Sequence, residues 1–184
     1  MDISKLIKEA KHGIAASQKC LFDQFSDKMM LVCRRYLKNN EDAEEALLNG
    51  FYKFFKNLGS FQYNAEARLY VWLKKIMINE CLMMLRSKSV FTMVTEDAVT
   101  DMQLEEDALN NLSAKEIFEL IIELPVGYRT IFNLHVIEGM NHKEIAAIAG
   151  ITEGTSKSQL SKARSLLQKK LLQNGLDYDK RKIK

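Results

Sequence analysis

Apolar residues recur at spacings of three and four along most of the chain, the pattern of helices that each bury one face. This pattern predicts helices at residues about 21–38, 41–58, 65–86, 113–124, 128–136, 142–149 and 155–173. Glycine (8) and proline (1) are too scarce for the many tight turns of a sandwich or barrel. The sequence therefore predicts an all-α fold.

Polar residues at the predicted helix starts offer side-chain caps for free backbone N–H groups. Asn40 or Asp42 can cap the second helix, and Thr155 can cap the last. Ser113 opens a capping-box pattern before the fourth helix. We expect that fourth helix to stop at Pro125, the one proline of the chain.

Formal charge is segregated along the chain. Residues 1–88 carry 15 Lys+Arg against 10 Asp+Glu (+5), and residues 89–114 carry six acids and no base (−6). Residues 115–184 carry 12 against 8 (+4), so the three segments sum to the net +3. Two basic segments suggest two contacts with a polyanion, and a solvated linker explains the acidic segment equally well.

The helical pattern is interrupted at residues 88–110, which lack clear periodicity and are the best linker candidate. We expect two small helical domains at 1–88 and 113–174, joined by a flexible acidic linker at 89–112. A basic tail would follow at 175–184. The C-terminal domain is predicted to be a helix-turn-helix, winged-helix-like but without a wing.

Several classes of protein are disfavoured by composition. The three cysteines are odd in number and lack metal-ligand spacing, so buried thiols in a reducing cytoplasm are expected. The charged N-terminus has no signal-peptide core, and no run approaches the ~18 apolar residues of a membrane span. No glycine-rich phosphate motif or nucleophile–base pattern accompanies the three histidines. We therefore expect no catalytic residue, metal, cofactor or small-molecule substrate, which disfavours an enzyme with a DNA-binding tail.

The strongest local motif spans residues 141–160 and has the pattern of a helix-turn-helix. Ala146 is small where the two helices would cross, and Gly150 follows where the turn can need a positive φ. The shared core would be formed by Ile145, Ile148 and Ile151. Ser156 occupies a position that is often apolar in such motifs, so we expect a less well-defined core there.

The predicted last helix is chemically polarised. It carries no acid between Gly154 and Leu176, and a stripe of leucine and alanine runs along one side. Lysine and glutamine can read base edges in the major groove, while hydroxyl and basic groups hold phosphates. The candidate DNA-contacting residues are Thr155, Lys157, Ser158, Gln159, Ser161, Lys162 and Arg164. A solvated basic face is the alternative, and the preceding helix and turn favour DNA binding.

Half of the 16 aromatic residues fall between Phe51 and Trp72. Phe51, Phe54 and Phe55 lie on the core stripe of their helix and are predicted to be buried. The others are mixed with polar side chains in a loop and helix start: Phe61, Tyr63, Tyr70 and Trp72 with Asn64, Arg68, Lys74 and Lys75. Such a mixture can stack on unpaired bases, although Trp72 could equally belong to the core.

Four segments resemble bacterial sigma factors, and they occur in the order of that family. Residues Glu41–Phe51 resemble the polymerase-clamp-binding helix, and Trp72–Glu80 resembles the tryptophan-led helix after the promoter-melting loop. Leu124–Arg129 and Gly154–Arg164 resemble the C-terminal promoter-reading domain. The short chain with only two domains resembles the extracytoplasmic-function (ECF) group.

Three positions depart from the family pattern. Ile78 and Met83 stand where the family often has arginine and aspartate, so neither carries a predicted role. Gln159 replaces a frequent arginine, which leaves the promoter sequence preference open.

The resemblance implies a cytoplasmic protein that binds RNA polymerase core and directs promoter-specific initiation on double-stranded and melted DNA. By analogy, the polymerase-binding residues are Asp42, Glu45, Leu48, Asn49 and Tyr52. Those facing the melted minus-ten element are Phe61, Tyr63, Asn64, Arg68, Trp72, Lys75 and Asn79. The last helix would read the minus-thirty-five element. An anti-sigma factor, often at the inner membrane, is an expected partner. The alternative is a helix-turn-helix regulator that does not bind core polymerase.

Overall fold

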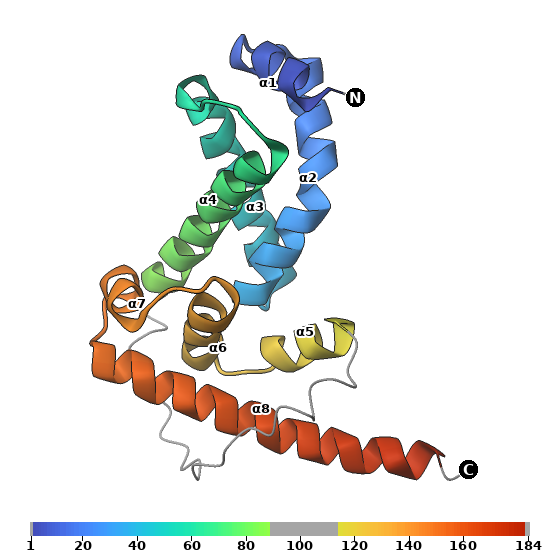
Figure 1. The fold of residues 1–184 in the computed structure, drawn as a ribbon, viewed down its shortest axis with the longest axis vertical. Helices are drawn as coiled ribbons and strands as arrows, with labels where there is room; N and C mark the ends of the chain where they lie inside the picture. Colours follow the sequence, from blue (N-terminus) through green and yellow to red (C-terminus); the bar gives the residue numbers. More distant parts are fainter. Residues whose placement is uncertain (1, 89–113, 183–184) are drawn as a thin grey trace. The chain divides into compact units, whose positions relative to one another are not determined.

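The computed structural model describes residues 2–88 and 114–182, and all regular elements within these ranges are helical (Figure 1). The all-α prediction is therefore confirmed. The chain divides into two compact units, Met1–Lys88 and Ser89–Lys184, and each is described by itself. The predicted linker and the candidate cap Ser113 lie outside the described residues. None of the described helices is long and apolar enough to cross a membrane.

The first unit is built from four α-helices and a short 3₁₀ helix. They are α1 (Ile3–Lys11), α2 (Ala15–Tyr36), α3 (Asn40–Asn57), η1 (Leu58–Ser60) and α4 (Glu66–Ser87). Helix α1 is absent from the predicted elements. Its start is capped by the Asp2 carboxylate, which accepts from the Ser4 N–H at 2.9 Å. It buries one apolar face made of Ile3, Leu6, Ile7 and Ala10.

The start of α3 differs from the prediction. The Asn39 side chain, rather than Asn40 or Asp42, caps this helix by accepting from the Glu41 N–H at 2.9 Å. Asp42 lies within the first turn, where its carboxylate accepts from the Lys88 ammonium at 2.6 Å. This ion pair therefore joins the end of α4 to the start of α3.

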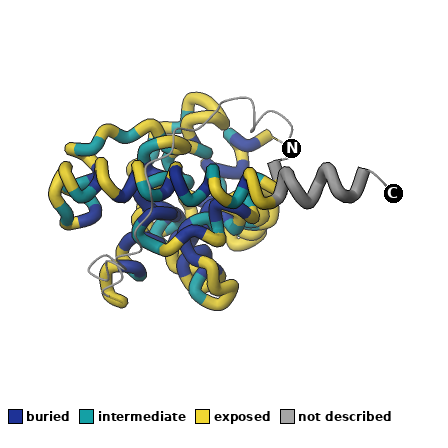
Figure 2. Tube along the Cα trace, turned by 90° about the horizontal axis from the view of Figure 1, so that it is seen from below, coloured by how far each residue is buried: buried dark blue, intermediate teal, exposed yellow. Residues whose placement is uncertain are grey.

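The core of the first unit lies between α2, α3 and α4. Its largest fully buried side chains include Leu21, Phe25, Met29, Tyr36, Phe54, Leu73 and Met77. Phe51 and Phe54 are buried and Phe55 is half-buried, which confirms the predicted core role for the first two. Along the helices, buried positions are interleaved with exposed ones, as one-sided burial requires (Figure 2).

The second unit contains α5 (Ala114–Ile122), α6 (Val126–Phe132), a π-helical turn η4 (Asn133–Ile137), α7 (His142–Ala149) and α8 (Glu153–Lys182). Its hydrophobic core combines α5, α6 and α8 through Leu120, Leu124, Tyr128, Ala163, Leu167 and Leu171. Pro125 separates α5 from α6, as predicted, and stands at the N-cap of α6. The buried Arg129 guanidinium donates to the carbonyls of Ile122 (2.8 Å) and Leu124 (3.2 Å), so it closes the end of α5.

The helix-turn-helix is formed by α7, a short turn and α8. Asn141 and Glu144 make a capping box at the start of α7. Gly150 ends this helix with φ +70°, which confirms the predicted positive φ. The prediction of Thr155 as the cap of the last helix is wrong: α8 begins at Glu153, and the Thr152 hydroxyl accepts from the Thr155 N–H at 3.0 Å.

Candidate nucleic-acid and protein interfaces

One face of α3 carries four of the five residues predicted to bind polymerase. Glu45, Leu48, Asn49 and Tyr52 follow one another at helical spacing and are all exposed. Leu48 is 60% exposed and Tyr52 is 65% exposed, so this face presents two large side chains with apolar surface to solvent. Asp42 is half-buried in its ion pair with Lys88, so it lies at the edge of this face.

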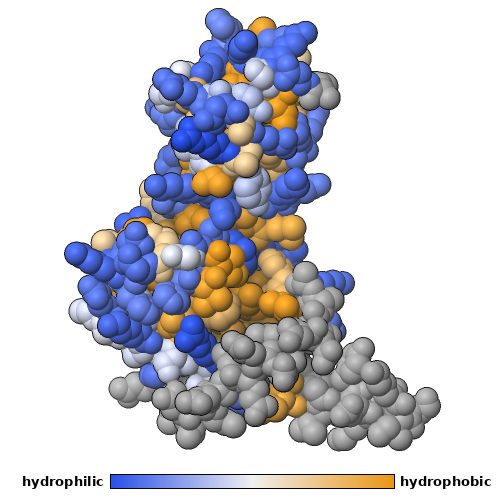
Figure 3. Space-filling model, viewed as in Figure 1, coloured by the Kyte–Doolittle hydropathy of each residue, from blue (hydrophilic) through white to orange (hydrophobic). Residues whose placement is uncertain are grey.

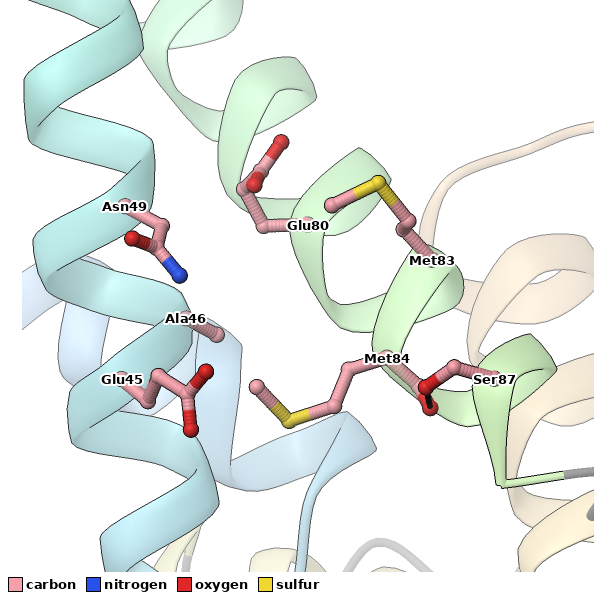
Figure 4. Close-up of a pocket in the computed structure, with 7 residues that line it drawn as sticks. All are labelled: Glu45, Ala46, Asn49, Glu80, Met83, Met84 and Ser87. Atoms are coloured by element: carbon pink, nitrogen blue, oxygen red, sulfur yellow. Dashed lines mark hydrogen bonds between the residues drawn. The ribbon is translucent and has the colours of Figure 1, made fainter.

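A groove of about 190 Å³ lies between α3 and α4 beside that face (Figure 4). Glu45, Ala46 and Asn49 point into it from α3, and four residues close it from α4: Glu80, Met83, Met84 and Ser87. The Glu80 carboxylate is buried and accepts from the Lys53 ammonium at 2.7 Å. The groove thus adds the thioether groups of Met83 and Met84 to the α3 face, which suits contact with a mixed apolar and polar protein surface.

The predicted strand-binding residues of α4 share another face. Arg68, Trp72, Lys75 and Asn79 recur at spacings of four, three and four, so they lie along one side of the helix. Arg68, Lys75 and Asn79 are exposed, whereas Trp72 is half-buried. A row of one aromatic ring, two cations and an amide is suited to an unpaired nucleic-acid strand.

The loop before α4 places a second ring over Trp72. The Phe61 and Trp72 rings are stacked, with centroids 4.5 Å apart and planes 6° apart. On α3, Phe54 lies 5.2 Å from Trp72 at 50°. Trp72 is therefore neither a buried core residue nor a free stacking surface: it is held between a core ring and a loop ring. Tyr63 and Asn64 follow in the same loop, half-buried and exposed respectively.

The predicted DNA-reading helix keeps most of its candidate residues accessible. Lys157, Ser158, Ser161 and Arg164 are exposed on α8, while Thr155 and Lys162 are half-buried. The exposed four fall at spacings of one, three and three, and so define a single polar and basic face. This face has the composition expected for phosphate and base-edge contacts in a DNA groove.

Gln159, which was predicted to read DNA, is buried in this structure. Its side chain is only 6% exposed, because it packs against α6 at Gly127. The Gln159 Oε1 lies 3.3 Å from the place where a Cβ on Gly127 would stand. The absence of a side chain at Gly127 thus lets α6 come close enough to α8 to cover the amide.

A histidine pair that sequence reasoning missed packs beside the helix-turn-helix. The rings of His135 and His142 stack with centroids 4.5 Å apart and planes 10° apart. His142 Nδ1 shares a hydrogen bond of 2.9 Å with the hydroxyl of Ser156, which is fully buried. This bond explains how serine is tolerated where an apolar residue was expected. The signal was available in the sequence as a histidine fourteen residues before the unusual serine.

The surroundings of His142 disfavour its charged form. Loss of hydration is the largest cause that lowers its pKa below the usual value, followed by the charge of His135. Further charged side chains on α8 act in both directions: Lys157 and Arg164 lower the pKa, and Glu153 raises it. Folding of the helix-turn-helix therefore favours the neutral form of His142.

The thiols of the first unit are structural in character. Cys33 and Cys81 are buried, as expected, whereas Cys20 is half-buried. A hydrogen bond with Cys33, together with burial, raises the pKa of Cys81 far above its usual range, so its thiol stays protonated. Within the described residues, no group of three or more His, Cys, Asp or Glu side chains is arranged to hold a metal ion.

Comparison with known proteins gives a family for both units. Residues 21–90 match sigma-70 region 2, and residues 108–167 match sigma-70, region 4. The ECF RNA polymerase sigma factor SigW of Bacillus subtilis is 30% identical, over 93% of this chain and 97% of that protein. The ECF RNA polymerase sigma-E factor of Haemophilus influenzae is 24% identical, over 90% of this chain and 93% of its own.

A solved structure with a related sequence is the sigma factor RpoE of Bartonella quintana in complex with the anti-sigma factor NepR. It is 23% identical with a TM-score of 0.47, over 84% of this chain and 96% of that chain. The match to SigW extends over nearly the whole of both chains and includes both sigma-70 regions. This chain belongs to the extracytoplasmic-function (ECF) family of RNA polymerase sigma factors.

Proposed function

We propose that the two units divide the work of promoter recognition. The first binds RNA polymerase core through α3 and takes up the melted minus-ten strand on α4, and the second reads the minus-thirty-five element with α8. The chain contributes binding in this scheme, and the polymerase contributes the chemistry of RNA synthesis. The domain limits that this scheme uses are those expected from the sequence: 1–88, a linker at 89–112 and a promoter-reading domain at 113–174.

The observation that carries the proposal is the separation of two unlike faces on neighbouring helices of the first unit. The face of α3 presents Leu48 and Tyr52 with a carboxylate and an amide, which suits a folded protein partner. The face of α4 presents Arg68, Lys75 and a stacked tryptophan, which suits an unpaired strand. A regulator that only binds duplex DNA has no need of either face.

Strand capture on α4 is supported by the chemistry of base extrusion. Opening a base pair costs a few kcal/mol per base, and stacking on an aromatic ring returns about 1–3 kcal/mol. Phe61, stacked on Trp72, supplies the ring, Tyr63 and Asn64 lie in the same loop, and the cations of α4 can hold the backbone. The proposed minus-ten site is therefore the loop before α4 together with the exposed side of α4.

Promoter-specific run-off transcription tests the proposal directly. Purified chain added to core polymerase should give discrete transcripts from a subset of genomic templates, and core alone should give none. Co-purification with core separates the alternatives. A folded chain that binds promoter DNA but never core would be a helix-turn-helix regulator. A chain that binds core without starting transcription on any genomic template would contradict the proposed function.

We also propose an anti-sigma factor among the partners, as membership of this family implies. The exposed apolar groups of α3, Leu48 and Tyr52, suit a protein that competes with core polymerase. When this chain is used as bait in a cell extract, changing Leu48 and Tyr52 to serine should abolish co-purification of both the anti-sigma factor and core polymerase. A bait changed at Lys28, an exposed residue of α2, should keep both. Retention of the regulator by the serine variant would place its contact elsewhere.

A further inference from the structure

The last turn of α1 is bonded to the loop that carries the proposed minus-ten site. The Lys11 ammonium donates to the Phe61 carbonyl at 2.5 Å, although the two residues are 50 positions apart in the chain. In Figure 1 this places the end of α1 beside the connection from α3 to α4. A helix that no sequence pattern had linked to strand capture thus contacts the capture loop.

Lys11 is held on a well-anchored helix. Helix α1 is anchored by four buried apolar side chains, each at most 8% exposed: Ile3, Leu6, Ile7 and Ala10. The Ser17 hydroxyl of α2 donates to the Glu9 carboxylate at 2.5 Å, and the Gln18 amide donates to the Ala10 carbonyl at 3.2 Å. The outer surface of this end of the unit is mostly hydrophilic on the face seen in Figure 3. Lys11 therefore extends from a fixed base.

Phe61 is restrained at both ends of its backbone. Its N–H donates to the Leu58 carbonyl at 3.1 Å, and its carbonyl accepts from Lys11. Leu58 is itself fully buried, which ties η1 to the core. Because both backbone groups are hydrogen-bonded, the Phe61 backbone is fixed in position, and its ring stacks on Trp72 with the centroids 4.5 Å apart.

We propose that Lys11 is a positioning residue for strand capture: by fixing the Phe61 carbonyl it keeps the Phe61 and Trp72 rings stacked and ready for an unpaired base. This inference rests on the proposed function. Its physical basis is preorganisation, because a loop already ordered in the binding geometry does not lose conformational entropy when the strand arrives. An ordered aromatic loop is most valuable where melted bases must be trapped before they pair again.

The first test uses the free, full-length chain, in which Trp72 is the one tryptophan. Lys11→Met should increase acrylamide quenching of the Trp72 fluorescence. Phe61→Ala, which removes the stacked ring, is the reference variant and should shift the quenching in the same direction. Lys11→Arg should keep the wild-type value, since a guanidinium can donate to the same carbonyl. Lys8→Met is the matched control, because Lys8 is an exposed lysine of the same helical turn. Thermal unfolding of each variant checks that the fold is kept.

The second test measures open-complex formation with reconstituted holoenzyme on a promoter that the wild type opens. Lys11→Met should slow opening about five-fold, the effect expected from one lost hydrogen bond, while core binding stays at the wild-type level. Lys11→Arg and Lys8→Met should open the promoter at the wild-type rate. Loss of core binding in parallel would indicate a general structural defect and would count against a positioning role.

Two outcomes would overturn the inference. If Lys11→Met changes neither Trp72 quenching nor opening, the bond has no positioning role. If opening slows while quenching in the free chain is unchanged, Lys11 acts on the DNA itself, as a phosphate contact would. Failure of the wild-type holoenzyme to open any promoter would instead contradict the proposed function, and the quenching series would still decide whether Lys11 orders the stack.

Discussion

A Cβ atom placed on Gly50 in α3 would stand 2.2 Å from the sulfur of Met77 in α4, and 2.8 Å from its terminal methyl carbon. Met77 is fully buried, so making room for a side chain at position 50 would require its thioether to move within a packed core. The missing side chain at position 50 is therefore what allows the two helices to pack this closely. Because α3 carries the proposed polymerase face and α4 the proposed strand face, this contact sets how the two faces lie with respect to each other.

Gly50→Ala should lower the free energy of unfolding by about 1–3 kcal/mol, the usual cost of overpacking a core. Alanine normally stabilises a helix interior relative to glycine, so the sign of the change is diagnostic. Gly59→Ala is the control, because nothing lies within 4 Å of a Cβ there and its φ is not positive. Urea unfolding measures both. A more stable Gly50→Ala variant would mean that Met77 can move aside.

Removal of the Lys53 ammonium should destabilise the first unit, because it leaves the buried Glu80 carboxylate without this donor at 2.7 Å. We expect Lys53→Met to cost about 1–3 kcal/mol of unfolding free energy. The double variant Lys53→Met, Glu80→Met should recover most of the loss, since an apolar pair can replace a buried ion pair. Simple additivity of the two single changes in a denaturation series would show that the pair is not coupled.

The sequence predicted the helices that have long apolar stripes, but not the details that place the site. The apolar spacing of Ile3, Leu6, Ile7 and Ala10 is regular, yet α1 is too short for periodicity to stand out. The stack of Phe61 on Trp72 depends on a loop conformation, about which helical periodicity says nothing.

Helix periodicity also fails to say how wide a buried stripe is. Gln159 lies next to the apolar stripe of α8, and burial of its side chain depends on α6 crossing at Gly127. Thr152 rather than Thr155 caps α8, because the helix begins two positions before Thr155. Helix ends cannot be placed to within one or two residues from sequence signals. The burial of Gln159 depends on a contact between two helices, which a local sequence pattern cannot encode.

The histidine pair predicts a stability that falls at acid pH. The pKa of His142 is lower in the folded protein than in the unfolded chain, so between these two values the unfolded chain binds more protons. Stability should therefore be full above about pH 6.5 and decline as pH falls through the lowered pKa of the folded state. Thermal unfolding of the wild type and of His142→Gln at a series of pH values below and above 6.5 measures how much of the pH dependence of stability comes from His142. Equal pH profiles would show that His142 does not contribute.

The basic face of α8 predicts which residues govern minus-thirty-five binding. Lys157→Ala should weaken holoenzyme binding to a minus-thirty-five duplex at all sequences and reduce the salt slope by about 0.9, as loss of one phosphate contact requires. Lys169→Ala removes the same charge from an exposed site farther along α8 and should have less effect. Binding to core polymerase should not change in either variant.

Gln159 provides the matching prediction from burial. Gln159→Met keeps a side chain of similar length against Gly127, and it should leave the preferred minus-thirty-five sequence unaltered because position 159 faces α6 rather than solvent.

Lys162→Ala, at a half-buried but basic position, should weaken binding as Lys157→Ala does. Selection of preferred duplexes from a randomised minus-thirty-five library compares the variants. A changed preference in Gln159→Met alone would contradict the prediction from burial and would show that the Gln159 amide contributes to the choice of sequence.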